Sequence, residues 1–261
     1  MNKTKIVATI GPKTCSVSNL KKLYYAGMTV ARLNGSHNNL NWHSQTIKRI
    51  KEVLPDIPIL FDMPGKKIRT CQLEYEPSFK KNDIIIMTTD ASYNGIEKIK
   101  LNKDNLHIYL KKNDVIFADD GTLSFTVLKI KGNDIYCKAK NKGILRSAKG
   151  INVPHVKLGK DKLSDKEKKI LKFIVKNHIH FVGVSFVESS KYLREIRKYS
   201  KTNNLKIIAK IENKGGLNNM DDIISESDGV MIDRGDLSTE TSFETIALYQ
   251  KKIIKKCNSL S

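Results

Sequence analysis

Charged side chains follow two short apolar runs in the last third of the sequence, and their types and spacing could do chemistry. Lys210 and Glu212 end the first run, and Asp236 lies just beyond the second, Gly229–Ile232. Residues two apart on a strand point to the same side, so Lys210 and Glu212 are expected to share a face. Two carboxylates and one ammonium can together hold a divalent ion and a phosphorylated anion. Taken alone, the same pattern also fits a structural salt bridge at a strand end.

Alternating strand-like and helix-like segments precede this motif and must position it. Strands are expected over Lys5–Ile10, Val30–Asn34 and Ile57–Asp62, and helices over Ser18–Ala26 and Leu40–Val53. Such alternation is typical of parallel strands joined by crossover helices.

The pattern changes between about Cys71 and Lys149, where the segments are short and strand-like. Turn signals such as Lys81-Asn82-Asp83 and Gly132-Asn133-Asp134 separate these segments. We therefore expect a small β domain, residues 71–149, inserted between two segments of one α/β domain, residues 1–70 and 150–261.

The alternation resumes at Ser164, where the sequence Ser-Asp-Lys-Glu is typical of a helix start. Strands are expected over Phe181–Phe186, Leu205–Ile211 and Gly229–Ile232, and helices over Asp165–Asn177, Lys191–Ser200, Asn219–Ser225 and Phe243–Lys256. The sequence thus has about six βα units, whereas a closed TIM-type barrel needs eight. The predicted fold class is α/β, an incomplete TIM-type (β/α) barrel with an inserted β domain.

Short motifs distributed over nearly the whole chain carry a resemblance to a known family. They are Thr4–Pro12, Ala26–His37, Ile68–Thr70 after Asp62, Asp119–Gly121, Lys149–Pro154, Leu163–Lys166, Ser185–Val187 and the two runs that end near Lys210 and Asp236. In this order and at this spacing, the chain resembles the pyruvate kinases. The resemblance implies that the inserted domain is a small β-barrel lid. It also implies the glycolytic transfer of a phosphoryl group from phosphoenolpyruvate to ADP, which yields pyruvate and ATP.

The resemblance further implies roles for polar side chains at the carboxyl ends of the strands, where barrel enzymes gather their sites. The matched catalytic residues are Lys210, which would neutralise the phosphoryl group in transfer, and the arginines Arg32 and Arg69. The matched ligands of Mg²⁺ or Mn²⁺ are Glu212 and Asp236.

Other matched positions would bind a monovalent cation and the nucleotide. The cation ligands are Asn34, Ser36 and Asp62, and the nucleotide-binding residues are His37, Lys149 and Asp120, of which Asp120 lies in the lid motif. His37 fits an ordinary polar loop residue equally well.

Some positions depart from the family pattern. Met63 stands where the family has threonine, Glu188 where it has arginine, and Asp233 where an alanine precedes Arg-Gly-Asp. Asp233 would repel the carboxylate of the substrate, so it is expected to turn away or to pair with a lysine. No residue up to Ser261 matches the family's threonine implicated in proton delivery.

Lys67 stands two residues before Arg69, where potassium-dependent members of the family have a glutamate. An ammonium fixed near Asp62 could supply the positive charge of the potassium ion, so K⁺ is expected not to be required. A solvated surface lysine is the alternative in this lysine-rich chain.

The composition argues against several other classes of protein. No apolar run is long enough to cross a bilayer and no signal segment opens the sequence, so a soluble cytoplasmic protein with no membrane partner is expected. Four scattered cysteines fit reduced thiols. The net charge of +20 favours anionic partners. No nucleic-acid-binding module is present, so nucleic acid is not an expected partner. The resemblance to the pyruvate kinases implies phosphoenolpyruvate and ADP or ATP as partners.

Two other functions remain open from the sequence. One is a phosphoenolpyruvate- or oxoacid-handling paralogue that has lost the kinase step, and the other is a non-catalytic binding protein. Intact Lys210, Glu212 and Asp236 favour an enzyme, whereas the missing strands favour a binding protein. A sheet with an open edge at its sixth strand is normally covered or paired, so either a homo-oligomer or a longer polypeptide of which this chain is a part is expected.

Overall fold

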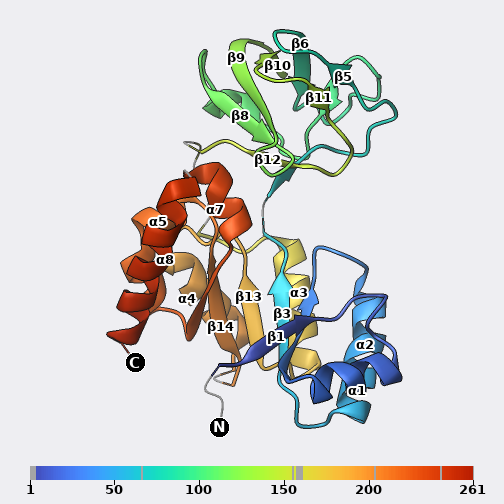
Figure 1. Ribbon diagram of the computed structural model, residues 1–261, viewed down its shortest axis with the longest axis vertical. Helices are drawn as coiled ribbons and strands as arrows, with labels where there is room; N and C mark the ends of the chain where they lie inside the picture. Colours follow the sequence, from blue (N-terminus) through green and yellow to red (C-terminus); the bar gives the residue numbers. More distant parts are fainter. Residues whose placement is uncertain are drawn as a thin grey trace.

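The computed structural model describes residues 4–65, 67–154, 156, 161–202, 204–241 and 243–260. The chain forms a parallel sheet covered by helices and, at the other end of the long axis, a module built from β-strands (Figure 1). The outer ends of the predicted segments 1–70 and 150–261, which are residues 1–3 and residue 261, lie outside the described residues.

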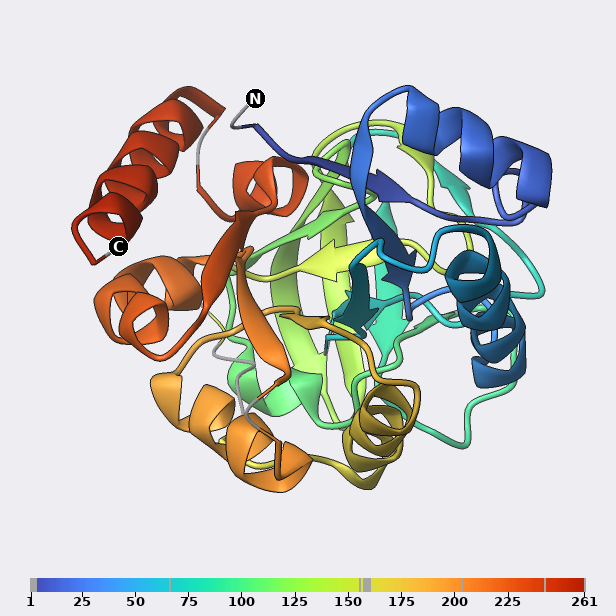
Figure 2. The same cartoon turned by 90° about the horizontal axis from the view of Figure 1, so that it is seen from below.

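Six parallel strands form the first sheet, in the order β1-β2-β3-β13-β14-β15. The strands are β1 (Ile6–Thr9), β2 (Met28–Asn34), β3 (Ile59–Met63), β13 (Phe181–Val184), β14 (Lys206–Ile211) and β15 (Gly229–Ile232). Each strand lies beside the next one of this sheet along the chain, and the sheet curls into half a barrel (Figure 2). Within the described residues, the edge strands β1 and β15 each pair on one side only.

Helices surround the outside of the curled sheet (Figure 2). They are α1 (Val17–Tyr25), α2 (Leu40–Val53), α3 (Asp165–Lys176), α4 (Ser190–Ser200), α5 (Lys214–Asn218), α6 (Met220–Ser225), α7 (Arg234–Glu240) and α8 (Phe243–Asn258). Helix α7 lies at the end of the sheet that faces the β-strand module (Figure 1).

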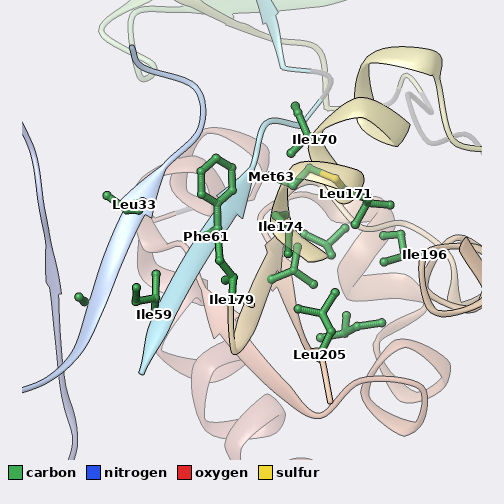
Figure 3. Packing of buried hydrophobic residues seen from close by; sticks show 14 of the residues in the cluster. Leu33, Ile59, Phe61, Met63, Ile170, Leu171, Ile174, Ile179, Ile196 and Leu205 are labelled. Carbon is green, nitrogen blue, oxygen red and sulfur yellow. The ribbon is translucent and has the colours of Figure 1, made fainter. Parts of the chain in front are cut away.

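Apolar side chains of the central strands and of the helices build the main core (Figure 3). All five residues of β3 are buried, and Phe61 is among the largest fully buried side chains. Ile170 and Ile174 lie one turn apart on α3 and pack into the same core, as expected for the apolar face of a helix. The start of α3 is fixed by the predicted capping box, in which Ser164 and Glu167 bind each other's backbone N–H groups.

The second sheet has seven strands in the order β4-β12-β8-β9-β10-β6-β7. Its strands are β4 (Ile68–Arg69), β6 (Ile84–Thr88), β7 (Ile99–Lys100), β8 (Val115–Ala118), β9 (Leu123–Lys131), β10 (Asp134–Ala139) and β12 (Gly150–Asn152). Strands β5 (Ser78–Phe79) and β11 (Gly143–Ile144) pair separately, and the short 3₁₀ helix η1 covers Leu106–Tyr109. We call residues 68–152, from β4 to β12, the β module.

The β module closes on itself and has a core of its own. Cys71 N donates to Lys100 O at 2.8 Å and Asn102 N to Arg69 O at 3.0 Å, so the chain at the first strand, β4, bonds to the chain at the last, β7. A separate cluster of buried apolar residues, which includes Phe125, fills its interior.

The α/β barrel-like architecture predicted from the alternation is confirmed, with six strands at the predicted places. No bounds were predicted for helices α5 and α7, and Asp236, expected just beyond the strand, lies inside α7. Each has seven residues or fewer, and Gly215, Gly216 and Gly235 weaken the helical signal. None of the described helices is long and apolar enough to cross a bilayer.

Candidate functional site

Side chains from neighbouring strands meet at the carboxyl end of the parallel sheet. Lys210 Nζ of β14 lies 2.6 Å from Glu212 Oε1, 3.6 Å from Asp62 Oδ2 of β3 and 3.3 Å from Ser185 Oγ, just past β13. Arg32 of β2 binds Asp62 Oδ2 through Nε and Nη2, at 2.9 and 2.5 Å. Parallel strands end at the same edge of a sheet, which explains why these residues, far apart in the sequence, come together.

The ionisable groups of this cluster are buried. Lys210 is 6% exposed, Asp62 2% and Glu212 1%. Burial raises the pKa of Glu212 to about 7, against the lowering effects of the Lys210 ammonium and of a hydrogen bond from Phe186 N. Burial would lower the pKa of Lys210, but Glu212 and Asp62 outweigh it and raise that pKa. Lys210 therefore stays protonated, and Glu212 takes up a proton at a higher pH than an exposed glutamate does.

The side chain of Asp62 has room beside the neighbouring strand β13 because the paired residue of that strand is a glycine. The backbone of Asp62 lies in register with Asn34 of β2 and with Gly183 of β13. A Cβ atom on residue 183 would collide with Asp62 Oδ1, so glycine is needed for this carboxylate to lie against β13. Asp62 Oδ1 is buried and has no hydrogen-bond partner among the described residues. Such an oxygen is expected to accept a cation or a donor from a bound molecule.

Three carboxylates form a group beside Lys210. One oxygen each of Glu212, Asp233 and Asp236 lie within 4.8 Å of one another. Asp233 caps α7, because its Oδ1 accepts a hydrogen bond from Asp236 N at 3.3 Å, and its Oδ2 lies 4.0 Å from Lys210 Nζ. Asp233 thus approaches a lysine, one of the two arrangements expected from the sequence. Carboxylate oxygens are the ligands that Mg²⁺ and Mn²⁺ prefer, so this group fits one divalent ion.

Lysines at the border of the β module complete the surroundings. Lys67 Nζ contacts Asp236 and lies 3.7 Å from Asp120 Oδ1. Lys149 Nζ binds Asp119 Oδ1 at 2.7 Å. At the carboxyl end of the sheet, Lys67 therefore contacts Asp236 of the three-carboxylate group and not Asp62, near which the sequence placed it.

Four other predicted site residues make different contacts. Arg69 donates from Nη1 to Ala148 O at 3.0 Å, within the β module. Asn34 Oδ1 accepts a hydrogen bond from Ser36 N at 3.0 Å, and His37 is exposed in the same turn. Within the described residues, no hydrogen bond or ion pair joins these four side chains to Lys210.

Comparison with known proteins shows which family shares this sequence. The family profile described as "Pyruvate kinase, barrel domain" matches residues 1–261. The pyruvate kinase of Bacillus licheniformis is 37% identical over 270 residues, which cover 100% of this chain and 46% of that protein. This chain belongs to the pyruvate kinase family. The pyruvate kinase of Thermococcus litoralis is 34% identical over 264 residues, which cover 98% of this chain and 56% of that protein.

This member of the pyruvate kinase family spans about half the length of the curated relatives that it matches. Residues at positions that depart from the family pattern make contacts in the structure. Glu188 Oε1 accepts a hydrogen bond from Asn213 Nδ2 at 2.7 Å, and Met63 is buried in the main core. From the sequence, Asp233 was expected near the substrate's carboxylate but not among the metal ligands, and Ser185 lay in a matched motif with no assigned role. An aspartate three residues before another acidic residue is an N-cap signal, and this signal could have located Asp233.

Proposed function

We propose that this chain carries the phosphotransferase site of a pyruvate kinase, which moves the phosphoryl group of phosphoenolpyruvate to ADP and yields pyruvate and ATP. The observation that supports it best is the position of Lys210, between Asp62 and Glu212 and beside a three-carboxylate group. Phosphoryl transfer depends mainly on positioning and on electrostatic stabilisation. A buried ammonium whose place is fixed by several partners provides both.

The cationic side chains would bind and orient the phosphorylated substrate. Lys210 would neutralise charge on the phosphoryl group during transfer. Arg32 presents the planar donor pair that now binds Asp62, and the same donors suit phosphate oxygens. Arg69 would supply a further guanidinium when the β module approaches the substrate.

The carboxylates would hold the cations. Glu212 and Asp236 would bind Mg²⁺ or Mn²⁺, with Asp233 close enough to contribute a third oxygen. When bound, the ion supplies neutralisation of charge on the phosphate and on the enolpyruvate oxygens. Asn34, Ser36 and Asp62 would form the site of a monovalent cation, and the free oxygen of Asp62 suits that role. Lys67 contacts Asp236 and not Asp62, but its ammonium would still bring a fixed positive charge to this end of the sheet, which would make potassium unnecessary.

The β module would act as the lid over this site. Residues 71–149 are proposed as the inserted lid domain, with residues 1–70 and 150–261 as the two barrel segments. The nucleotide would bind at the border between them, near His37, Lys149 and Asp120. Lys67 and Asp120 already contact each other across that border.

One observation favours a second function. Asp233 adds a negative charge beside the metal-binding group, which would weaken binding of the substrate's carboxylate. A phosphoenolpyruvate- or oxoacid-binding protein without the kinase step is therefore the alternative.

A lactate-dehydrogenase-coupled assay of pyruvate formation from phosphoenolpyruvate and ADP tests the proposal. Turnover is expected in the unmodified chain and in Lys206→Met, an exposed lysine on the same strand, and is expected to be lost in Lys210→Met. Full turnover in Lys210→Met would contradict the site. If the unmodified chain shows no turnover but binds phosphoenolpyruvate in calorimetry, the result would support a binding protein without the kinase step. If it shows neither turnover nor binding, the result would contradict both functions.

A further inference from the structure

Lys67 contacts the group formed by Glu212, Asp233 and Asp236 although it lies on none of the strands or helices that carry them. It lies in the short connection between β3 and β4, and its Nζ contacts Asp236 Oδ1. Its side chain is 14% exposed and that of Asp236 12%, so water screens this pair little. The same ammonium lies 6.0 Å from the centre of the ring of Phe186, whose own backbone N–H donates to Glu212 Oε2.

The position of this ammonium conflicts with a divalent ion in the same group. Asp236 supplies one of the three oxygens that lie within 4.8 Å of one another. A carboxylate in contact with an ammonium binds a metal ion less readily, because two cations on the same carboxylate repel each other. Lys210 also approaches the group, but it has Asp62 and Ser185 as further partners away from Asp236.

We propose that Lys67 and the divalent cation compete for Asp236. The Lys67 ammonium neutralises the carboxylate while the metal is absent, and the metal displaces it on binding. Lys67 is thus a positioning residue that sets the affinity for the metal. The inference rests on the proposed function only in requiring that Glu212, Asp233 and Asp236 bind a divalent ion.

Displacement of Lys67 from Asp236 would also change the contacts at the border between the half-barrel and the β module. Lys67 is 3.7 Å from Asp120 of the module, while Asn152 Nδ2 of the module donates to Glu240 Oε1 of α7 at 3.2 Å. Metal binding breaks the contact between Lys67 and Asp236 and leaves the one between Asn152 and Glu240 in place. The ammonium then remains beside Asp120, since the next residue, Ile68, is held in β4 by its pairing with β12.

Binding of Mn²⁺ to the whole chain, followed by electron paramagnetic resonance of the free ion, tests the competition without any need for activity. Lys67→Met is expected to bind Mn²⁺ about tenfold more tightly than the unmodified chain, because it removes a positive charge at a metal ligand. Lys98→Met is the matched control, because Lys98 binds Asp134 at 2.6 Å within the β module, and it should not change the affinity. Equal affinities for Lys67→Met and the unmodified chain would overturn the inference alone.

A second measurement uses the unmodified chain and so does not depend on the folding of a variant. Acetylation of Lys67 by an N-hydroxysuccinimide ester, quantified by mass spectrometry, is expected to be faster with Mn²⁺ than without it, whereas Lys98 should not respond. An unchanged rate at Lys67 in the presence of bound Mn²⁺ would overturn the competition. If Asp236→Asn and the unmodified chain alike bind no Mn²⁺, the metal site of the proposed function is wrong, and this inference fails with it.

Discussion

Replacement of Lys210 by methionine is expected to lower the stability of the fold as well as to remove the proposed activity. The Lys210 side chain is 7% exposed and neutralises two buried carboxylates, Asp62 at 3.6 Å and Glu212 at 2.6 Å. Methionine fills a similar volume but carries no charge. The substitution therefore leaves two buried carboxylates with less compensation than before.

The size of the effect follows from the partners that remain. Removing one member of a buried ion pair typically costs about 3–5 kcal/mol of stability. Asp62 keeps the two hydrogen bonds from Arg32, and Glu212 keeps the one from Phe186 N, so the lower end, about 3 kcal/mol, is expected. A domain is stable by about 5–15 kcal/mol in total, so Lys210→Met should still fold at 25 °C.

Urea unfolding followed by circular dichroism measures this loss. With a urea dependence of about 3 kcal/mol per molar, the midpoint should fall by about 1 M. The matched control is Lys206→Met on the same strand, whose exposed ion pair with Asp228 should contribute less than about 1 kcal/mol. The double variant Lys210→Met, Glu212→Gln should recover part of the loss. A midpoint for Lys210→Met within error of the Lys206→Met value would refute the reasoning.

Three further outcomes are expected. Turnover should not depend on potassium in a tetramethylammonium background, and Lys67→Glu should introduce that dependence; strong activation of the unmodified chain by potassium would contradict this. Burial raises the pKa of Cys137 to about 12, so its thiol should resist alkylation at pH 8 and react only after unfolding. The free energy of unfolding should fall as the pH rises from 9 toward 12, because only the thiol of the unfolded chain ionises in this range. Cys137→Ala should reduce this dependence on pH. The unpaired edges of β1 and β15 should lead to self-association, and light scattering that shows single chains at all concentrations would count against it.

The half-barrel was predictable because its signals are local. Each strand of the first sheet is a short apolar run, and the longer helices carry an apolar face with clear start signals such as the capping box at Ser164. The β module was predicted as an insertion from the density of its turns. Its strand order was not predicted, because pairings such as β4 with β12 join residues about eighty positions apart and leave no periodic trace.

The inner part of the site was predictable for a related reason. Parallel strands end at one edge, so polar residues at strand ends must converge, and Arg32, Asp62, Lys210 and Glu212 do so. The sequence also carried the glycine at residue 183 that lets Asp62 approach the next strand, but its role becomes visible only from the register.

The outer part of the site depends on two short segments whose direction no sequence period encodes. Helix α7 has seven residues, and its first turn decides that Asp233 and Asp236 face Glu212. The connection from β3 to β4 decides that Lys67 meets Asp236, although its nearest strand-end carboxylate along the chain is Asp62. Both segments lie where the half-barrel and the β module meet, so their conformations depend on packing between units that the sequence describes separately. Two of the residues that depart from the family pattern, Lys67 and Asp233, are found there, and they bring opposite charges to the same three-carboxylate group.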